Sequence, residues 1–430
     1  MPSARIDIPA TIKAYNQGRE PQLLARKYAA MRTDPFVFLR GSCHLFYARL
    51  PAAGVLQKAP ATWICGDLHI ENFGSYKGDN QLVYFDLNDF DEATLAPCSW
   101  EMLRLLTSIR FAMAGLGLDE DLVDQLCELT VQTYAGELAT GKARWIERDT
   151  ADGLIGELLE HLRSRKDLLA KRTVLEDGRR RLRIDHDKLL PATAEQTRSV
   201  RRLMKQVGRE HGAAEFFEVM DVARRVAGTG SLGVARYIVL VQGKGGDDGH
   251  QLLDLKQALG SSLHSQVEST AAWSTPAEQV VAIQRRMQAI SPALLQAVEM
   301  DGASYVLRAL QPSEDRIDLH SSPRSVPHLQ GLLTRLAQLT AWSQLRSSGR
   351  DGSACADALI AYAGKRRWKT RLADLSAECA QRVRRDWKAF ARAYDQGYFG
   401  EAAPVEPREA ASEEPALPAA ADAGTAPRSS

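Results

Sequence analysis

Two acidic segments lie close together in the N-terminal part of the sequence. The motif GDLHIEN occupies residues 66–72 behind a short apolar run, and a second apolar run leads into the motif DLNDFDE at residues 86–92. Carboxylates this close together repel one another unless a cation or hydrogen-bond donors neutralise them. Oxygen ligands from Asp and Asn are also what hold Mg²⁺ on the phosphates of a nucleotide. The two segments therefore indicate a site for a metal-bound phosphate compound.

The spacing inside the first segment fits a kinase catalytic loop, in which the base Asp and the metal-binding Asn are five residues apart. Asp67 and Asn72 have this separation. We predict that Asp67 is the catalytic carboxylate and that Asn72 binds the metal. Asp89 is the expected second metal ligand, with Asp86 as the alternative. Asp and Asn also simply form turns at strand ends, which is the competing interpretation.

His69 lies between these two residues in the motif. We assign it to the catalytic set, with an orienting role favoured over proton transfer. A buried histidine that only makes a structural hydrogen bond is the alternative.

A glycine motif of the form GxGxxG occurs much later, at residues 228–233. In a dinucleotide-binding fold this motif must stand between a strand and a helix. The run that follows it, ARYIVLVQ, is instead typical of a strand. A glycine hairpin between two strands covers the nucleotide phosphates in kinases. We therefore predict phosphate contacts from Gly228, Gly230, Ser231 and Gly233.

The kinase interpretation requires a lysine on the strand after the hairpin, and Lys256 in the run LLDLKQA meets this requirement. Its ammonium group is expected to pair with the α- and β-phosphates. Glu278 at the start of a predicted helix, or Glu268, would hold the lysine in place. An acidic residue at a helix start is equally typical of a solvated helix end. Arg40 either contacts phosphate or forms a surface ion pair.

The motifs also carry a resemblance to known families. GDLHIEN resembles the GDLHxxN loop of aminoglycoside and choline phosphotransferases, which have the protein-kinase-like fold. The segment 89–101 is similar to their metal-binding segment and the helix after it, although Glu101 stands where those enzymes usually have Asp. Together, DPFVFLRG, GDLHIENFG and FDLNDFDEA resemble a family of uncharacterised bacterial proteins, the domain of unknown function 2252, over most of residues 20–400. The resemblance implies a kinase-like fold and no established reaction.

In kinases the glycine loop and lysine precede the catalytic loop, whereas here they follow it. The motifs of the uncharacterised family have this same permuted order. Permutation is possible because a site depends on which groups meet in space and not on their order in the chain. The hypothesis requires that Lys256 lies close to Asp67 and Asp89 in the folded protein.

We therefore predict an α+β protein with a protein-kinase-like two-lobed fold, a small β-rich lobe, a large mostly helical lobe and a circularly permuted motif order. Residues 1–220 are assigned to the large lobe with its catalytic and metal loops, and 221–320 to the small nucleotide-binding lobe. Residues 321–400 complete the large lobe. The last segment, 401–430, is rich in Ala, Pro and Glu and is expected to be a disordered tail.

Composition limits the partners. The chain of 430 residues has 55 Lys and Arg against 54 Asp and Glu, so it has no general attraction for nucleic acid or anionic membranes. The six cysteines show no metal-finger spacing, and no apolar run has the length of a membrane span. These features predict a cytoplasmic protein without nucleic-acid or membrane partners, and they specify no oligomeric state.

The expected function is an ATP- and Mg²⁺-dependent phosphotransferase, acting on a small molecule in preference to a protein. Transfer of AMP on the same fold is one alternative, and a nucleotide-binding scaffold without catalysis is another. A metal-dependent phosphoesterase is a third, because GDLH also fits the first metal motif of those enzymes. The later motifs such an enzyme needs, of the GDxxD and GNH type, are missing from the sequence.

Overall fold

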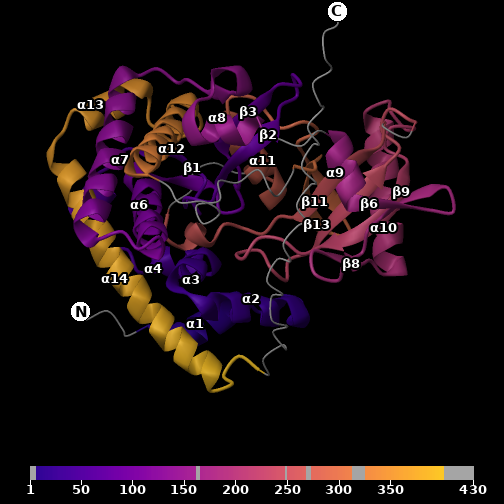
Figure 1. Cartoon of the computed structure of the whole chain (residues 1–430), viewed down its shortest axis with the longest axis horizontal. Coiled ribbons are helices and arrows are strands. Elements are labelled where there is room, and N and C mark those ends of the chain that lie inside the picture. The colour runs from indigo at the N-terminus through magenta and orange to yellow at the C-terminus, as the bar shows by residue number, and fades with distance from the viewer. Residues whose placement is uncertain (1–5, 161–164, 247–248, 268–272, 312–324, 401–430) are drawn as a thin grey trace, which may run out of the picture.

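A computed structural model describes residues 6–160, 165–246, 249–267, 273–311 and 325–400. The predicted disordered tail, 401–430, lies outside the described residues. The chain is a mixed α+β protein, as predicted, with helices gathered on one side and a six-stranded sheet on the other (Figure 1). Among the described residues, no helix combines the length and the apolar character that crossing a membrane requires.

The helical part draws on both ends of the chain and shares one hydrophobic core. Helix α6 is buried along most of its length; α7 and α14 pack against it, and α12 packs against α7 (Figure 1). The helices of this helical part are α1 (Ile8–Tyr15), α2 (Pro21–Thr33), α3 (Pro35–Gly41), α4 (Cys43–Ala48), α5 (Gly54–Gln57), α6 (Cys98–Gly115), α7 (Glu120–Thr140), α8 (Gly153–Glu160), α11 (Pro276–Met287), α12 (Val326–Arg346), α13 (Ala356–Ala363) and α14 (Arg367–Asp395).

Local sequence explains where these helices begin. Asp34 caps α3 by accepting hydrogen bonds from the backbone N–H groups of Phe36 and Val37, and Pro35 occupies the first helical position. Helix α7 begins after the cap Asp119 and ends at Gly141, which has a left-handed backbone. The motif DPFVFLRG is thus a helix start, and it fixes where Arg40 lies.

Two small sheets bring the acidic segments together. Strand β1 (Ala61–Ile64) pairs with β4 (Thr94–Pro97), while β2 (Phe73–Lys77) pairs with β3 (Val83–Leu87) and β3 with β5 (Ile146–Glu147). One acidic loop joins β1 to β2 and the other joins β3 to β4. The strand before the first loop pairs with the strand after the second, and the strand after the first loop pairs with the strand before the second. The two loops therefore lie side by side. The strands predicted for ATWIC and QLVYF are present.

The large sheet is antiparallel, with strand order β12-β13-β11-β10-β9-β8. Helix α10 (Ala194–Glu210) covers one face with apolar side chains, and α9 (Arg165–Arg172) with the hairpin β6–β7 covers part of the other. The strands are β6 (Thr173–Glu176), β7 (Arg179–Leu182), β8 (Leu189–Pro191), β9 (Val219–Arg225), β10 (Arg236–Val241), β11 (Gln251–Gln257), β12 (Gln296–Met300) and β13 (Ala303–Ala309). The sheet unit therefore begins before residue 221, where the sequence pattern changes to β.

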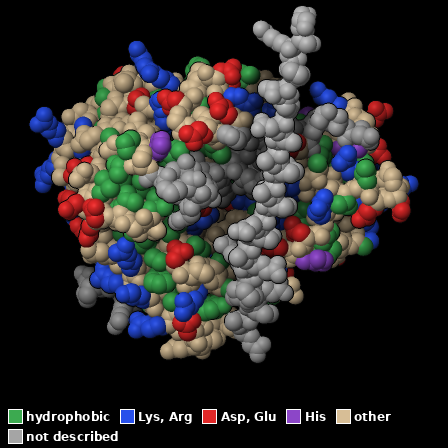
Figure 2. Space-filling model, in the orientation of Figure 1, with side chains coloured by type: hydrophobic (Ala, Val, Ile, Leu, Met, Phe, Trp, Pro, Cys, Tyr) green, Lys and Arg blue, Asp and Glu red, His purple; other side chains and the backbone are tan. Residues whose placement is uncertain are grey.

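The surface agrees with the balanced composition. Acidic and basic side chains are interspersed over the face seen in Figure 2, and neither sign forms one continuous area there.

Candidate functional site

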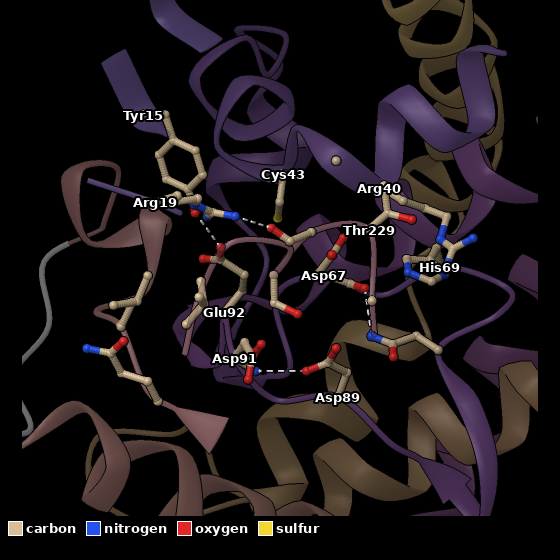
Figure 3. Close-up of a pocket in the computed structure, with 18 of the residues that line it drawn as sticks. Tyr15, Arg19, Arg40, Cys43, Asp67, His69, Asp89, Asp91, Glu92 and Thr229 are labelled. Carbon is tan, nitrogen blue, oxygen red and sulfur yellow. Dashed lines mark hydrogen bonds between the residues drawn. The ribbon is translucent and has the colours of Figure 1, made fainter. Parts of the chain in front are cut away.

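A pocket lies where the acidic loops meet the glycine loop and the N-terminal helices. The space between its walls, including the part that is open to solvent, measures about 830 Å³. Figure 3 shows the carboxylates of its acidic loops around one hollow, with arginines at its edge. The lining includes Asp67, His69, Asn72, Asp89, Asp91 and Glu92 from the acidic loops and Gly228, Thr229, Gly230 and Ser231 from the glycine loop.

Gly66 lets the two acidic loops touch. Its φ is 83°, and a Cβ atom at this position would stand 2.1 Å from the carbonyl oxygen of Glu92. Only glycine fits this contact, since any side chain would push the loops apart.

Replacing Gly66 by Ala is therefore expected to destabilise the protein. We expect a loss of about 3 kcal/mol, from the strained backbone and the overpacked contact together. Gly212 is a matched control, because it has a φ of 62° and no atom within 4 Å of an added Cβ. Gly212→Ala should cost only about 1 kcal/mol. Urea unfolding of both variants measures the difference, and equal losses would contradict the contact.

Asp67 is held by a buried arginine from α6. Its Oδ1 accepts a hydrogen bond from Arg104 Nε at 2.8 Å and a second from Arg104 Nη2, which also donates to the carbonyl of Leu39 at 2.9 Å. Burial raises the pKa of Asp67, and the Arg104 guanidinium opposes this by favouring the carboxylate. The other oxygen, Oδ2, points toward the glycine loop, 3.8 Å from the position that a Cβ on Gly230 would take.

Asn72 closes the first acidic loop, residues 65–72. Its side-chain Nδ2 donates to the backbone carbonyl of Asp67 at 2.8 Å. The backbone carbonyl of Asn72 accepts a hydrogen bond from the Asn88 N–H at 3.0 Å. The amide nitrogen is thus used inside the loop, and the predicted metal contact of Asn72 would have to come from its amide oxygen. His69 is buried beside Asn72 with its ring edge-on to Phe36, and its expected orienting role stays a prediction.

Lys256 reaches the second acidic loop from strand β11. Its ammonium forms an ion pair with Asp91 and lies 3.8 Å from Asp89 Oδ1, while Asp89 Oδ1 also accepts a bond from the Asp91 N–H at 3.3 Å. Although burial alone would raise it, Lys256 and Arg308 hold the pKa of Asp89 below its usual value. Lys256 thus meets Asp89, as the permuted order requires, while Lys256 lines an adjoining cavity and not the pocket that Asp67 lines.

The glycine loop lies between β9 and β10, two paired antiparallel strands. The dinucleotide-binding interpretation is therefore wrong, since that fold needs a helix after the motif. The loop rests on the α1–α2 connection. Arg19 donates to the carbonyls of Gly230 and Leu232 at 2.6 and 3.0 Å, and Lys27 donates to that of Gly230 at 2.8 Å. Ser231 bonds within the loop, to the Ala227 carbonyl at 3.3 Å.

Gly228 and Gly233 both have positive φ values, of 79° and 86°. At Gly233 a Cβ would also stand 2.8 Å from Arg19 Cβ. This glycine is thus required where the loop meets the N-terminal helices. Gly228 lines the pocket, whereas Gly233 lies in a second, adjoining cavity beside Lys256.

Two predicted residues lie elsewhere. Asp86 is buried in an ion pair with Arg346 at 2.6 Å and is not among the residues that line the pocket, so Asp89 is the better metal candidate. Glu278 does not meet Lys256; its carboxylate accepts a hydrogen bond from the Ser274 N–H at 2.9 Å, as a residue near a helix start often does. The reserve candidate Glu268 lies outside the described residues.

Two further residues singled out from the sequence, Arg40 and Glu101, make contacts within the protein itself. Arg40 forms an ion pair with Glu71 at 2.6 Å and also lines the pocket; a contact with phosphate stays a prediction. Glu101 is fully buried, where it accepts hydrogen bonds from the Cys65 N–H at 2.7 Å and from Gln344 at 2.9 Å. It thereby supports the strand end from which the first acidic loop starts.

Several site residues carry little signal in the sequence. Arg104 is detectable as a charge inside the apolar helix run WEMLRLL, but nothing there indicates its partner Asp67. Tyr15 and Arg19 precede the first motif, and only the fold brings them to Glu92 and the glycine loop. Lys27 is fully buried, and this burial lowers its pKa well below its usual value.

The oxygen donors suit a metal that needs few protein ligands. Among the described residues, no group of three or more His, Cys, Asp or Glu side chains is arranged to hold a metal ion by itself. The amide oxygen of Asn72 and the carboxylate of Asp89 fit Mg²⁺, which commonly takes one or two protein ligands and completes its shell with phosphate and water. They do not fit zinc, which prefers His and Cys.

Comparison with known proteins gives a family and no function. The sequence profile of a family described as "uncharacterized protein conserved in bacteria (DUF2252)" matches residues 19–393. Searches among curated proteins and among solved structures each found no match. The matched segment includes the acidic loops, the glycine loop and Lys256. Because the match covers most of its length, the chain belongs to this family of uncharacterized bacterial proteins.

Proposed function

We propose that this chain binds ATP with Mg²⁺ and transfers a phosphoryl group to an acceptor, which we expect to be a small molecule. One observation carries the proposal: the Lys256 ammonium from the sheet lies 3.8 Å from Asp89 and pairs with Asp91, beside the loop that holds Asp67. In this proposal the helical part and the sheet unit correspond to the two lobes of a kinase-like fold with permuted motif order.

Lys256 and the glycine loop would bind the phosphates. Phosphate oxygens are anionic acceptors like the carboxylate of Asp91, so an arriving phosphate can replace Asp91 at the ammonium. Asp91 is then free to turn toward a metal ion. Backbone N–H groups of the glycine loop add uncharged donors over the phosphate chain. Lys256 therefore exchanges one anion for another and is not left buried without a partner.

Asn72 and Asp89 would hold the metal. The Asn72 side chain is fixed by its hydrogen bond to the Asp67 carbonyl, and the charge of Asp89 is favoured by Lys256. Mg²⁺ bound there would neutralise charge that develops on the phosphates during transfer. The Asn72 amide is thus positioned, and the Asp89 carboxylate is ionised, before the metal arrives.

Asp67 would orient the attacking group of the acceptor. Its Oδ1 is fixed by Arg104, so the carboxylate cannot rotate freely, and Oδ2 points toward the glycine loop. Burial raises the pKa of this carboxylate, and Arg104 opposes the rise by favouring the ionised form. Positioning is consistent with phosphoryl transfer, whose transition state is stabilised mainly by orientation and charge.

A labelling screen tests the proposal. The full-length protein is incubated with Mg²⁺, a metabolite mixture and ATP labelled on either the γ- or the α-phosphate. Phosphoryl transfer predicts an acceptor that carries the γ-label, and Asp89→Asn should lose it. An acceptor carrying the α-label would instead show AMP transfer. Absence of any labelled acceptor, together with absence of Mg·ATP binding, would contradict the proposal.

A further inference from the structure

One face of the large sheet carries a row of basic side chains beside Lys256. Strand register places Arg236 of β10 opposite Lys256, and Arg308 of β13 opposite Asp254, which precedes Lys256 by two residues on β11. Because side chains alternate between the two faces of a strand, these four share one face, and Arg225 of β9 joins them in contact with Asp254. The four cationic side chains of the row are only 10–17% exposed.

The charges in this row do not balance. Asp254 accepts two hydrogen bonds from Arg236, at 2.8 and 2.5 Å, and also faces Arg225 at 3.1 Å and Arg308 at 3.7 Å. Two further carboxylates, Asp89 and Asp91, already face Lys256. Within the described part of the chain, the cluster thus has four cations, Arg225, Arg236, Lys256 and Arg308, against three carboxylates, Asp89, Asp91 and Asp254.

The excess charge falls on Arg225 and Arg308. Arg236 makes a two-pronged contact with Asp254, and this contact alone would balance the negative charge of that carboxylate. Burial lowers the pKa of Arg225 to about 9, and the neighbouring Arg236 adds to this effect. A buried cation that shares its counter-ion with other cations is costly unless another anion completes the cluster. A bound anion would therefore stabilise the row.

The row lies beside the glycine loop. Arg225, Arg236 and Lys256 line a cavity of about 220 Å³ together with loop residues 231–234, and Ser231 and Val234 also line the main pocket. The 220 Å³ consists of narrow gaps between side chains that leave no room even for a water molecule, so the glycine loop would have to move before a phosphate could enter. A polyphosphate could then extend from Lys256 past Arg225 toward Arg308, which faces the same Asp254 but lines neither cavity as it stands.

The pocket offers few apolar side chains to a nucleobase, and Tyr15 is the one aromatic hydrophobic residue among the described residues that line it. Its larger apolar side chains are Tyr15, Cys43, Val234 and Leu259, and charged groups or glycines make up much of the rest. Sites that bind small molecules are usually lined mainly by hydrophobic and aromatic side chains, with a few polar groups for orientation. Phosphate contacts with the basic row, and with Mg²⁺ held among the carboxylates, would therefore have to supply most of the binding free energy of a nucleotide.

We propose that Arg225 and Arg308, together with Lys256, bind the polyphosphate chain, and that the site recognises nucleotides by their phosphates with little preference for the base. This inference rests on the proposed function and deepens it, because it names the recognised part of the substrate. Inorganic tripolyphosphate should bind as well, since it carries the same anionic groups.

Calorimetry with the full-length protein and Mg²⁺ tests this inference, using ATP, GTP, CTP and inorganic tripolyphosphate. The four ligands should bind the unchanged protein with Kd values within about tenfold of one another. Arg225→Gln and Arg308→Gln should each weaken all four by about tenfold or more, because a charge-assisted contact is lost. Arg225→Lys should retain most of the affinity. Arg202→Gln, at a surface ion pair on α10, should change nothing.

The outcomes separate this inference from the proposed function. ATP binding that is unaffected in both glutamine variants, or that exceeds GTP and tripolyphosphate binding by a hundredfold, overturns the inference and leaves the proposed function standing. Binding of tripolyphosphate that depends on the arginines, without binding of nucleotides, supports anion binding by the basic row and contradicts the proposed function. Binding of none of the four overturns both. Asp254 keeps its contact with Arg236 in either variant, so both should fold, which circular dichroism checks.

Discussion

Asp67→Asn is expected to lower the rate of transfer by about 10²–10⁴-fold, the usual contribution of a positioned acid–base or orienting group. Mg·ATP binding should change by only a few-fold, because the proposed nucleotide contacts come from Lys256, Asp89 and the glycine loop. The amide is isosteric with the carboxylate and keeps an oxygen that can accept the Arg104 hydrogen bonds. The measurement is kcat on the acceptor that the labelling screen finds, with Kd for Mg·ATP determined in parallel.

Asp7→Asn provides a matched control for that substitution. Asp7 is an exposed cap of α1 and lies outside the pocket lining. Its variant should keep full activity. If Asp67→Asn retained the rate of the unchanged protein, Asp67 could not be the group that orients the acceptor. If it lost nucleotide binding as well, the carboxylate would have to serve the nucleotide and not the acceptor.

Arg104→Met is expected to destabilise the protein at least as much as Gly66→Ala. It would leave the Asp67 carboxylate without its counter-ion, and removal of one partner of a buried ion pair costs about 3–5 kcal/mol. Arg104 is fully buried, and its guanidinium also lies 5.0 Å from the ring centre of Phe46. Unfolding in urea, followed by circular dichroism, gives the loss in the free energy of unfolding.

A double-mutant cycle separates charge from packing at this site. In Asp67→Asn/Arg104→Met the buried carboxylate is gone, so the double variant should be more stable than the sum of the two single losses predicts. Arg104→Lys keeps the charge and loses the two-pronged geometry, so it should fall between Arg104→Met and the unchanged protein. Additive losses in the cycle would mean that the two residues do not depend on each other.

The sequence was sufficient for the parts of the site that are local in the chain. The strand before each acidic loop was recognisable from a short apolar run, and the spacing of Asp67 and Asn72 within one loop fixes their relation. The glycine hairpin could be distinguished from a strand–helix turn, because the residues that follow it favour a strand. That Lys256 meets the second acidic loop followed from combining these motifs, and the structure places it 3.8 Å from Asp89.

Other parts depend on contacts between distant segments, which no local pattern encodes. Asp86 belongs to the same acidic motif as Asp89, but strand alternation turns its side chain away from the pocket toward Arg346. Glu278 stands near a helix start, where the kinase interpretation expects the glutamate that holds the lysine. Its carboxylate instead accepts a hydrogen bond from the Ser274 N–H. Arg104 could be noticed as a buried charge without any indication of its partner. Helix α10 reads as a separate charged helix until the sheet that it covers is known.

The most direct test of the proposed nucleotide site is the binding of Mg·ATP to the unchanged protein and to Lys256→Met, measured by calorimetry. We predict binding that requires Mg²⁺ and that weakens by at least about tenfold in Lys256→Met, with Lys256→Arg less affected. An unchanged Kd in Lys256→Met, or no uptake of adenine nucleotide at millimolar Mg²⁺, would contradict the site.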